Sequence, residues 1–255
     1  MTDQILLCEV QDGIGRLVLN RPAQGNAINV AMADALMEAA VRLAEDPSVK
    51  VVTLTGNGRL FCAGGDIAAF SSGEPAAVIA RITVSLHAAI NRLATMPKPL
   101  ICLVNGPAAG AGLGLAMLGD IVIAAASAHF TSAYTAIAVS PDAGTSWLLP
   151  RLVGLRQAQD MILTNCRVGA EEAVAIGLVT RTVADEALAD EGERLAQSMT
   201  AGATAAFASS RRLLHRSYHS SLANHLEFEA AGIVSTAGSD EALAHFTAFQ
   251  DKNGN

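Results

Sequence analysis

Residues 101–126 read ICLVNGPAAGAGLGLAMLGDIVIAAA, and this stretch decides the fold. An apolar run leads into a glycine-rich turn at residues 110–114, and then an apolar segment and a second β-branched run follow. A strand, a glycine turn and a helix in this order aim backbone N–H groups at a negatively charged atom. The stretch therefore predicts a layered α/β fold with an anion-stabilising turn between a buried strand and a helix.

Two nucleotide-binding motifs do not fit this turn. A dinucleotide fingerprint requires G-x-G-x-x-G, but the third glycine here stands at position 114, one residue too early. A phosphate loop requires Gly-Lys-Ser/Thr, and no lysine is near. Close packing of a helix on a strand also needs small residues, so a purely structural interpretation stays open.

A second turn of small residues has the same arrangement. Residues 51–70 run from a strand, through Ala63, Gly64 and Gly65, to a helix start at Asp66. If one N–H group from each turn meets a single oxygen, the pair forms an oxyanion hole, which stabilises charge developing on a carbonyl oxygen. The two turns together favour carbonyl chemistry over phosphate binding.

Hydrophobic periodicity predicts the remaining elements. Two strands are expected within residues 5–22, helices at 29–47, 75–97, 113–120 and 146–165, and strands at 49–56, 99–106 and 121–130. Beyond residue 180 the pattern predicts only helices, at 186–199, 203–218, 221–234 and 240–252. We therefore expect a core over residues 1–190 and a helical region over 191–255, which packs on the core or on another subunit.

Composition narrows the possible partners. The 255 residues carry a formal net charge of −7 and no basic stripe, which argues against nucleic acid. No targeting segment or uninterrupted apolar span is seen, and the four cysteines are widely spaced, so we expect a cytoplasmic protein that binds no membrane. His215 and His219 are four residues apart but lack a third ligand, so no metal site is expected.

Six segments carry a family resemblance. They are LNRPAQGNAIN (19–29), FCAGGDI (61–67), VNGPAAGAGLGLA (104–116), DIVIAAASAHF (120–130), PDAGTSWLLPRLVG (141–154) and EEAVAIGLV (171–179). In this order they resemble the landmarks of the enoyl-CoA hydratase/isomerase (crotonase) superfamily. The resemblance implies a crotonase-like ββα spiral core with a C-terminal helical region, assembled as a homotrimer or as a hexamer of two trimers. It also implies an acyl-CoA thioester substrate and no cofactor besides the coenzyme A of that substrate.

The resemblance assigns roles by position. It implies that the N–H groups of Gly65 and Ala111 hold the thioester oxygen; many members have alanine at the first of these positions and glycine at the second. It places six residues along the coenzyme A: Ala27, Ala63, Gly64, Gly65, Asp66 and Ile67. It also implies contact between Lys252 and the coenzyme A phosphates, although the tail DKNGN is less basic than is usual in the family.

The chain departs from the family at both hydratase glutamates. Their positions are occupied by Gly114 and Tyr134, which disfavours ordinary hydration. One carboxylate remains nearby, Asp142, although Pro-Asp-Ala-Gly is also a good turn and aspartate a good helix cap. The segment PDAGTSWLLPRLVG resembles family isomerases that shift a double bond with a base at this aspartate. This favours an enoyl-CoA isomerase in which Asp142 shuttles a proton and Tyr134 shapes the pocket or bonds to Asp142.

Two alternatives stay open. The chain also resembles 4-chlorobenzoyl-CoA dehalogenase-like members, which implies hydrolysis with Asp142 as nucleophile and His87 as base. Taken as a single histidine on a helix, His87 is more typical of an ordinary position at the edge of the core than of a catalytic base. The third possibility is an acyl-CoA-binding protein that has lost its catalytic glutamates.

Overall fold

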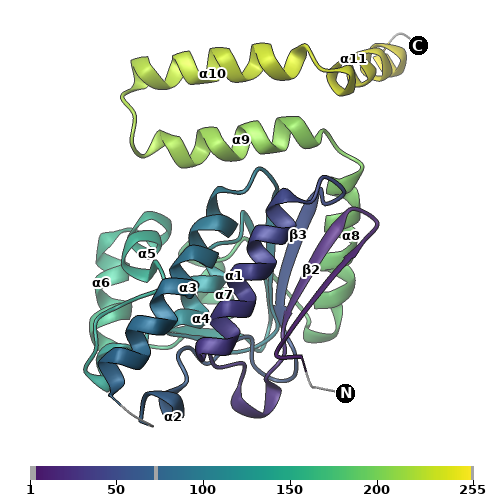
Figure 1. Cartoon of the computed structure of the whole chain (residues 1–255). Helices are drawn as coiled ribbons and strands as arrows, with labels where there is room; N and C mark the ends of the chain where they lie inside the picture. Colours follow the sequence, from purple (N-terminus) through teal and green to yellow (C-terminus); the bar gives the residue numbers. More distant parts are fainter. Residues whose placement is uncertain (1–3, 72–73, 254–255) are drawn as a thin grey trace.

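The computed structural model describes residues 4–71 and 74–253, and its body is built on a six-stranded sheet (Figure 1). The strand order is β1 (Leu6–Gln11), β2 (Ile14–Leu19), β3 (Val51–Gly56), β4 (Leu100–Val104), β6 (Ile121–Ala125) and β9 (Arg181–Val183). The first two strands pair antiparallel through a tight turn in which Asp12 and Gly13 both have positive φ. From β2 onward every pair is parallel, as expected for strands joined by helical crossovers.

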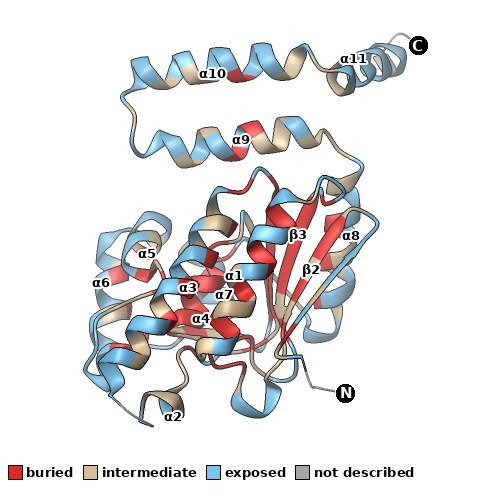
Figure 2. Ribbon diagram, in the orientation of Figure 1, coloured by how far each residue is buried: buried red, intermediate tan, exposed pale blue. Residues whose placement is uncertain are grey.

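Helices cover the sheet on both faces. α1 (Val30–Glu45) and α3 (Pro75–Thr95) pack against each other, and α8 (Leu188–Thr200) packs against β3, β4 and β6. The approach of α8 is close, because a Cβ added to Gly192 would lie 2.3 Å from a methyl group of Leu103. The inner strands β3, β4 and β6 are buried for this reason, β3 being red in Figure 2, and this burial explains their apolar sequences. The edge strand β1 is mostly exposed.

A second, smaller sheet carries the elements around the glycine turns. It contains β5 (Ala108–Ala109), β7 (His129–Thr131) and β8 (Val168–Gly169), in that order. The helices of this region are α2 (Ile67–Phe70), α4 (Ala111–Ala116), α5 (Thr145–Val153), α6 (Leu155–Thr164) and α7 (Ala170–Ala175). Three short 3₁₀ turns complete the body, at Pro22–Gln24, Thr135–Ile137 and Asp185–Ala187.

The C-terminal helices extend away from the body in Figure 1. They are α9 (Thr204–Ser217), α10 (Leu222–Ala237) and α11 (Asp240–Asn253). α9 is tied to the body by Arg211, which is buried and bonds to the carboxylate of Asp120 at 2.6 Å and to the carbonyl of Met96 at 2.6 Å. Most of α10 and α11 is exposed, including large apolar side chains such as Ile233, Val234 and Phe246.

Several expected boundaries were wrong. Residues 121–130 form two strands that belong to different sheets. Residues 146–165 form two helices, because Gly154 has φ 81° and ends the first of them. α4 begins at Ala111 and ends at Ala116, earlier than predicted, and β9 shows that strands do continue beyond residue 180. α8, which spans the expected boundary at residue 190, packs on β3, β4 and β6.

No helix within residues 4–71 and 74–253 is long and apolar enough to cross a membrane.

Candidate functional site

The two glycine turns lie directly against each other. Ala109 N–H donates to the carbonyl of Cys62 at 2.9 Å, and this joins the two segments backbone to backbone. A Cβ added to Gly64 would lie 2.9 Å from the carbonyl oxygen of Ala109 and 3.5 Å from the backbone nitrogen of Ala111. Only glycine permits this approach, and Gly64 also has φ 99°. The tertiary structure thus brings together the two turns that the sequence singled out.

In each turn one backbone N–H donates a hydrogen bond within the protein, and the next N–H does not within the described residues. Gly64 N–H donates to the sulfur of Cys62 at 3.4 Å, and Gly110 N–H donates to the carbonyl of Thr131 at 3.1 Å. The next N–H in each turn, of Gly65 and of Ala111, has no acceptor in the part of the chain that the structure describes. Two N–H groups on adjacent turns, those of Gly65 and Ala111, are therefore unpaired within the described residues, and these are the two donors that the resemblance implies.

Gly65 leaves room for a neighbouring aromatic ring. A Cβ added here would lie 2.4 Å from the ring of Phe70, which comes from α2. The phenylalanine ring thus fills the space of the missing methyl group.

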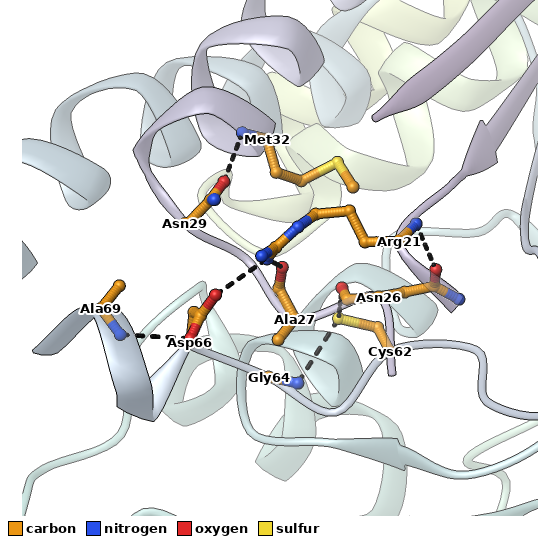
Figure 3. Close-up of polar contacts among 9 residues, drawn as sticks. All are labelled: Arg21, Asn26, Ala27, Asn29, Met32, Cys62, Gly64, Asp66 and Ala69. Atoms are coloured by element: carbon orange, nitrogen blue, oxygen red, sulfur yellow. Dashed lines mark hydrogen bonds and ion pairs between the residues drawn. The ribbon is translucent and has the colours of Figure 1, made fainter. Parts of the chain in front are cut away.

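A fully buried asparagine supports the turn at residues 63–65 (Figure 3). Asn26 has φ 56°, and its amide nitrogen donates to the carbonyls of Asn57 and Leu60 at 2.9 and 2.8 Å. Burial raises the pKa of the Cys62 thiol to about 12, so this thiol stays protonated and donates to the Asn26 carbonyl at 3.3 Å. Our sequence reasoning missed Asn26, although a polar residue beside a glycine in GNA is a signal for a left-handed turn.

A half-buried ion pair ties the same turn to the loop before α1. One nitrogen of Arg21 donates to the Asp66 carboxylate at 2.9 Å and to the Ala27 carbonyl at 2.5 Å (Figure 3). Asp66 also caps α2 by accepting from Ala69 N–H at 3.2 Å. Burial raises the pKa of Asp66, but the bonds from Arg21 and Ala69 and the charge of Arg21 outweigh it and hold this pKa below its ordinary value. The sequence analysis did not identify Arg21, since its partner is 45 residues away.

Backbone hydrogen bonds place Ala27 next to the other residues expected beside coenzyme A, at positions 63–67. Ile28 N–H donates to the Gly64 carbonyl at 2.7 Å, and Asp66 N–H donates to the Ile28 carbonyl at 3.0 Å. These bonds set Ala27 beside residues 63–67, among which Ala63 and Ile67 are exposed. Lys252 is different: it belongs to α11, at the opposite end of the molecule from α2 in Figure 1. Within one chain it does not join this surface, and its side chain lies outside the described part of the structure.

Asp142 stands in a tight turn before α5. Ala143 and Gly144 follow it with φ values of 53° and 76°. The helix cap is Gly144, so the Asp142 carboxylate does not serve as a cap and is available for other contacts. It lies 2.5 Å from Nε2 of His87, which reaches it from the middle of α3. Both side chains are partly exposed, so a substrate can approach the pair.

Tyr134 connects Asp142 to the glycine turn at residues 110–114. Its hydroxyl donates to the backbone carbonyl of Asp142 at 3.0 Å, and a Cβ added to Gly110 would lie 4.0 Å from its ring. Burial raises the pKa of the Tyr134 phenol, so this group stays protonated and remains a donor. The tyrosine contacts the main chain of Asp142, which leaves the carboxylate to His87.

The position of the first hydratase glutamate is closed. A Cβ added to Gly114 would lie 2.4 Å from the Ala143 carbonyl oxygen. The sequence indicated only that the carboxylate is absent, whereas the structure shows that the turn carrying Asp142 takes its space.

Comparisons with known proteins find relatives over most of the chain. The family model described as enoyl-CoA hydratase/isomerase matches residues 9–254. A 1,2-epoxyphenylacetyl-CoA isomerase of Escherichia coli is 40% identical over 200 residues, which are 77% of this chain and 76% of that protein. A 4-chlorobenzoyl coenzyme A dehalogenase of an Arthrobacter species is 29% identical over 254 residues, 98% of this chain and 92% of the other.

A solved structure of an enoyl-CoA hydratase/isomerase from Mycobacterium abscessus shares the fold. It is 32% identical, covers 97% of this chain and 96% of its own, and superposes with a TM-score of 0.94. The crotonase-like α/β fold with its C-terminal helical region is thereby confirmed, and the chain belongs to the enoyl-CoA hydratase/isomerase family.

Proposed function

We propose that this protein is an enoyl-CoA isomerase that moves a carbon–carbon double bond through an enolate. The N–H groups of Gly65 and Ala111 hold the thioester oxygen of a 3-enoyl-CoA. Asp142 takes a proton from C2, and the electron pair moves onto the oxygen to form the enolate. The same carboxyl group then returns the proton to C4, which gives the 2-enoyl-CoA. One donor to an enolate oxygen contributes about 3–4 kcal/mol of transition-state stabilisation.

The observation that carries this proposal is the number of carboxylates beside the free donors. Water addition in this family uses two glutamates, but here the first position is closed by Ala143 and the second is a tyrosine. Asp142 remains, next to Tyr134 and His87. A single carboxyl group suffices for a proton shuttle, because the proton that it takes is the proton that it gives back.

The test compares wild type with Asp142→Asn, His87→Gln and the control Asp190→Asn, an exposed carboxylate on α8. Conversion of 3-enoyl-CoA to 2-enoyl-CoA should be lost in Asp142→Asn, reduced in His87→Gln and unchanged in the control. If Asp142→Asn keeps full turnover on every 3-enoyl-CoA that wild type accepts, the proton-shuttle proposal is wrong.

Hydrolysis is the second candidate function, and the His87–Asp142 contact favours it. In that reaction a carboxylate oxygen of Asp142 bonds to a carbon of the acyl group while the leaving group departs from that carbon. Water activated by His87 then hydrolyses the resulting ester, which releases the product and restores the carboxylate. Mass spectrometry of a stalled reaction should then show a covalent adduct on Asp142, which the isomerase does not form. Coenzyme A thioester binding without turnover would instead support a non-catalytic binding protein.

The expected substrate and assembly follow from the same argument. We propose that residues 27 and 63–67 bind the coenzyme A portion of the substrate. The exposed apolar side chains of α10 and α11 support a homotrimer or a pair of trimers. Light scattering after gel filtration should give a mass of three or six chains, and a monomer would contradict this.

A further inference from the structure

A cavity of about 970 Å³ lies between α3, α5 and α9, next to the proposed catalytic residues. His87 and Gly144 belong to its lining, so it begins where the Asp142 turn meets α3. Its far side is formed by α9, which contributes Arg212 and Arg216. The mechanism above assigns no role to this space.

The cavity is cationic in a protein of net negative charge. Arg151, Arg211, Arg212 and Arg216 line it, and within the described part of the chain Asp120 is the acidic residue of the lining. Asp120 is already bonded to Arg211 at 2.6 Å. The other three arginines therefore face the space without a neutralising carboxylate.

Arg151 is held in place without a carboxylate partner. Its guanidinium lies 4.0 Å from the centre of the Trp147 ring and donates to the Trp147 carbonyl at 2.8 Å. Among the residues that the structure describes, no carboxylate lies within ion-pair distance of it. A guanidinium oriented by stacking, with donors left over, is suited to a carboxylate.

The rest of the lining is apolar. Ile90 on α3, Met117 beyond α4, and Trp147 and Leu148 on α5 form this part of the cavity. A ligand that matches both parts has an apolar body and a carboxylate at one end.

We propose that this cavity binds the far end of the substrate's acyl group and that this end carries a carboxylate, which pairs with Arg151. The inference rests on the proposed function, because Asp142 must act on the near end of the same chain. Arg151 lies six residues along α5 from Thr145, and its side chain folds back over Trp147, toward the end of the helix that follows the Asp142 turn. A short dicarboxylic acyl chain is therefore the appropriate probe.

The test measures kcat/KM for two thioesters that differ only at the far end, 3-hexenedioyl-CoA and 3-hexenoyl-CoA. Wild type should favour the first by about tenfold or more, as expected for a charged hydrogen-bonded pair. Arg151→Met should lose this preference. Arg212→Met, at an exposed position in the cavity lining, should weaken the preference for 3-hexenedioyl-CoA. Arg156 is exposed on α6 outside the cavity, so the control Arg156→Met should keep the preference. Calorimetry with free adipate on the same variants reports binding without turnover.

The outcomes separate the two proposals. Turnover of both thioesters with no preference, in wild type and Arg151→Met alike, overturns the carboxylate site and leaves the isomerase intact. No turnover of either, with adipate binding that Arg151→Met abolishes, overturns the isomerase and supports a cavity for a free dicarboxylate. Neither turnover nor adipate binding overturns both.

Discussion

Gly114 packs against the carbonyl of Ala143, so a side chain at position 114 collides with the turn that presents Asp142. A Cβ at position 114 would lie 2.4 Å from that oxygen and 2.9 Å from the Ala143 Cβ. Ala143 itself has φ 53°, a conformation that alanine adopts at a cost. One backbone arrangement therefore both closes position 114 to larger side chains and presents Asp142.

Gly114→Ala should lower the free energy of unfolding by about 1–3 kcal/mol, because the neighbouring turn must move. Gly169→Ala is the control: nothing lies within 4 Å of an added Cβ, and its φ of −74° suits any residue, so we expect a change below about 0.5 kcal/mol. Urea unfolding measures both. Gly114→Glu should not gain hydration of 2-enoyl-CoA, and a stable variant that hydrates would contradict our account of this position.

Ala111→Pro removes the proposed oxyanion donor with little change to its helix. Ala111 is the first residue of α4, a position where proline is tolerated. We expect kcat to fall by about 10²–10³-fold, which is typical for loss of one such donor. Ala170→Pro is a close match, since Ala170 also follows a glycine and begins a helix, and it should keep its activity. Normal turnover in a folded Ala111→Pro variant would exclude this N–H from the mechanism.

Tyr134→Phe removes the hydrogen bond to the Asp142 carbonyl but keeps the ring that packs near Gly110. A neutral hydrogen bond contributes about 1 kcal/mol, so kcat should fall by about fivefold. KM should change little, because the hydroxyl positions Asp142 and does not touch the substrate in our mechanism. A large rise in KM with kcat unchanged would assign the hydroxyl to substrate binding instead.

Asp66→Asn tests the ion pair between Asp66 and Arg21, which holds the turn at residues 63–65. The pKa of Asp66 lies below its ordinary value in the folded protein, so the pair stabilises the fold above about pH 4. That stabilisation is lost as the pH falls through the folded-state pKa. At pH 7 the variant should lose about 1–3 kcal/mol, and the difference from wild type should shrink as the pH falls below about 4.

Thermal melting across this pH range measures the effect. Glu45→Gln breaks the exposed pair with Arg92 and should change stability by less than about 1 kcal/mol. A difference between Asp66→Asn and wild type that does not vary with pH would show that the Asp66 charge is not what stabilises the turn.

Local sequence was sufficient for much of the fold. β-branched runs predicted the buried parallel strands, and small residues after two of them predicted the glycine turns. The predictions failed where a single residue redirects the chain. Gly154 at φ 81° divides the helix expected at residues 146–165, and β9 has three residues, too few for a periodic pattern.

The sequence by itself determined the local chemistry of this protein: where backbone donors are concentrated, and that both hydratase glutamates are absent. These features depend on the conformations open to glycine and on residue identity, which short segments specify. Only the tertiary structure decided which donors are free, because Thr131 and Cys62 accept from Gly110 and Gly64 but leave the next N–H groups unpaired. It also decided that His87 meets Asp142 across 55 residues. Such contacts arise from packing between distant segments, and no local pattern encodes them.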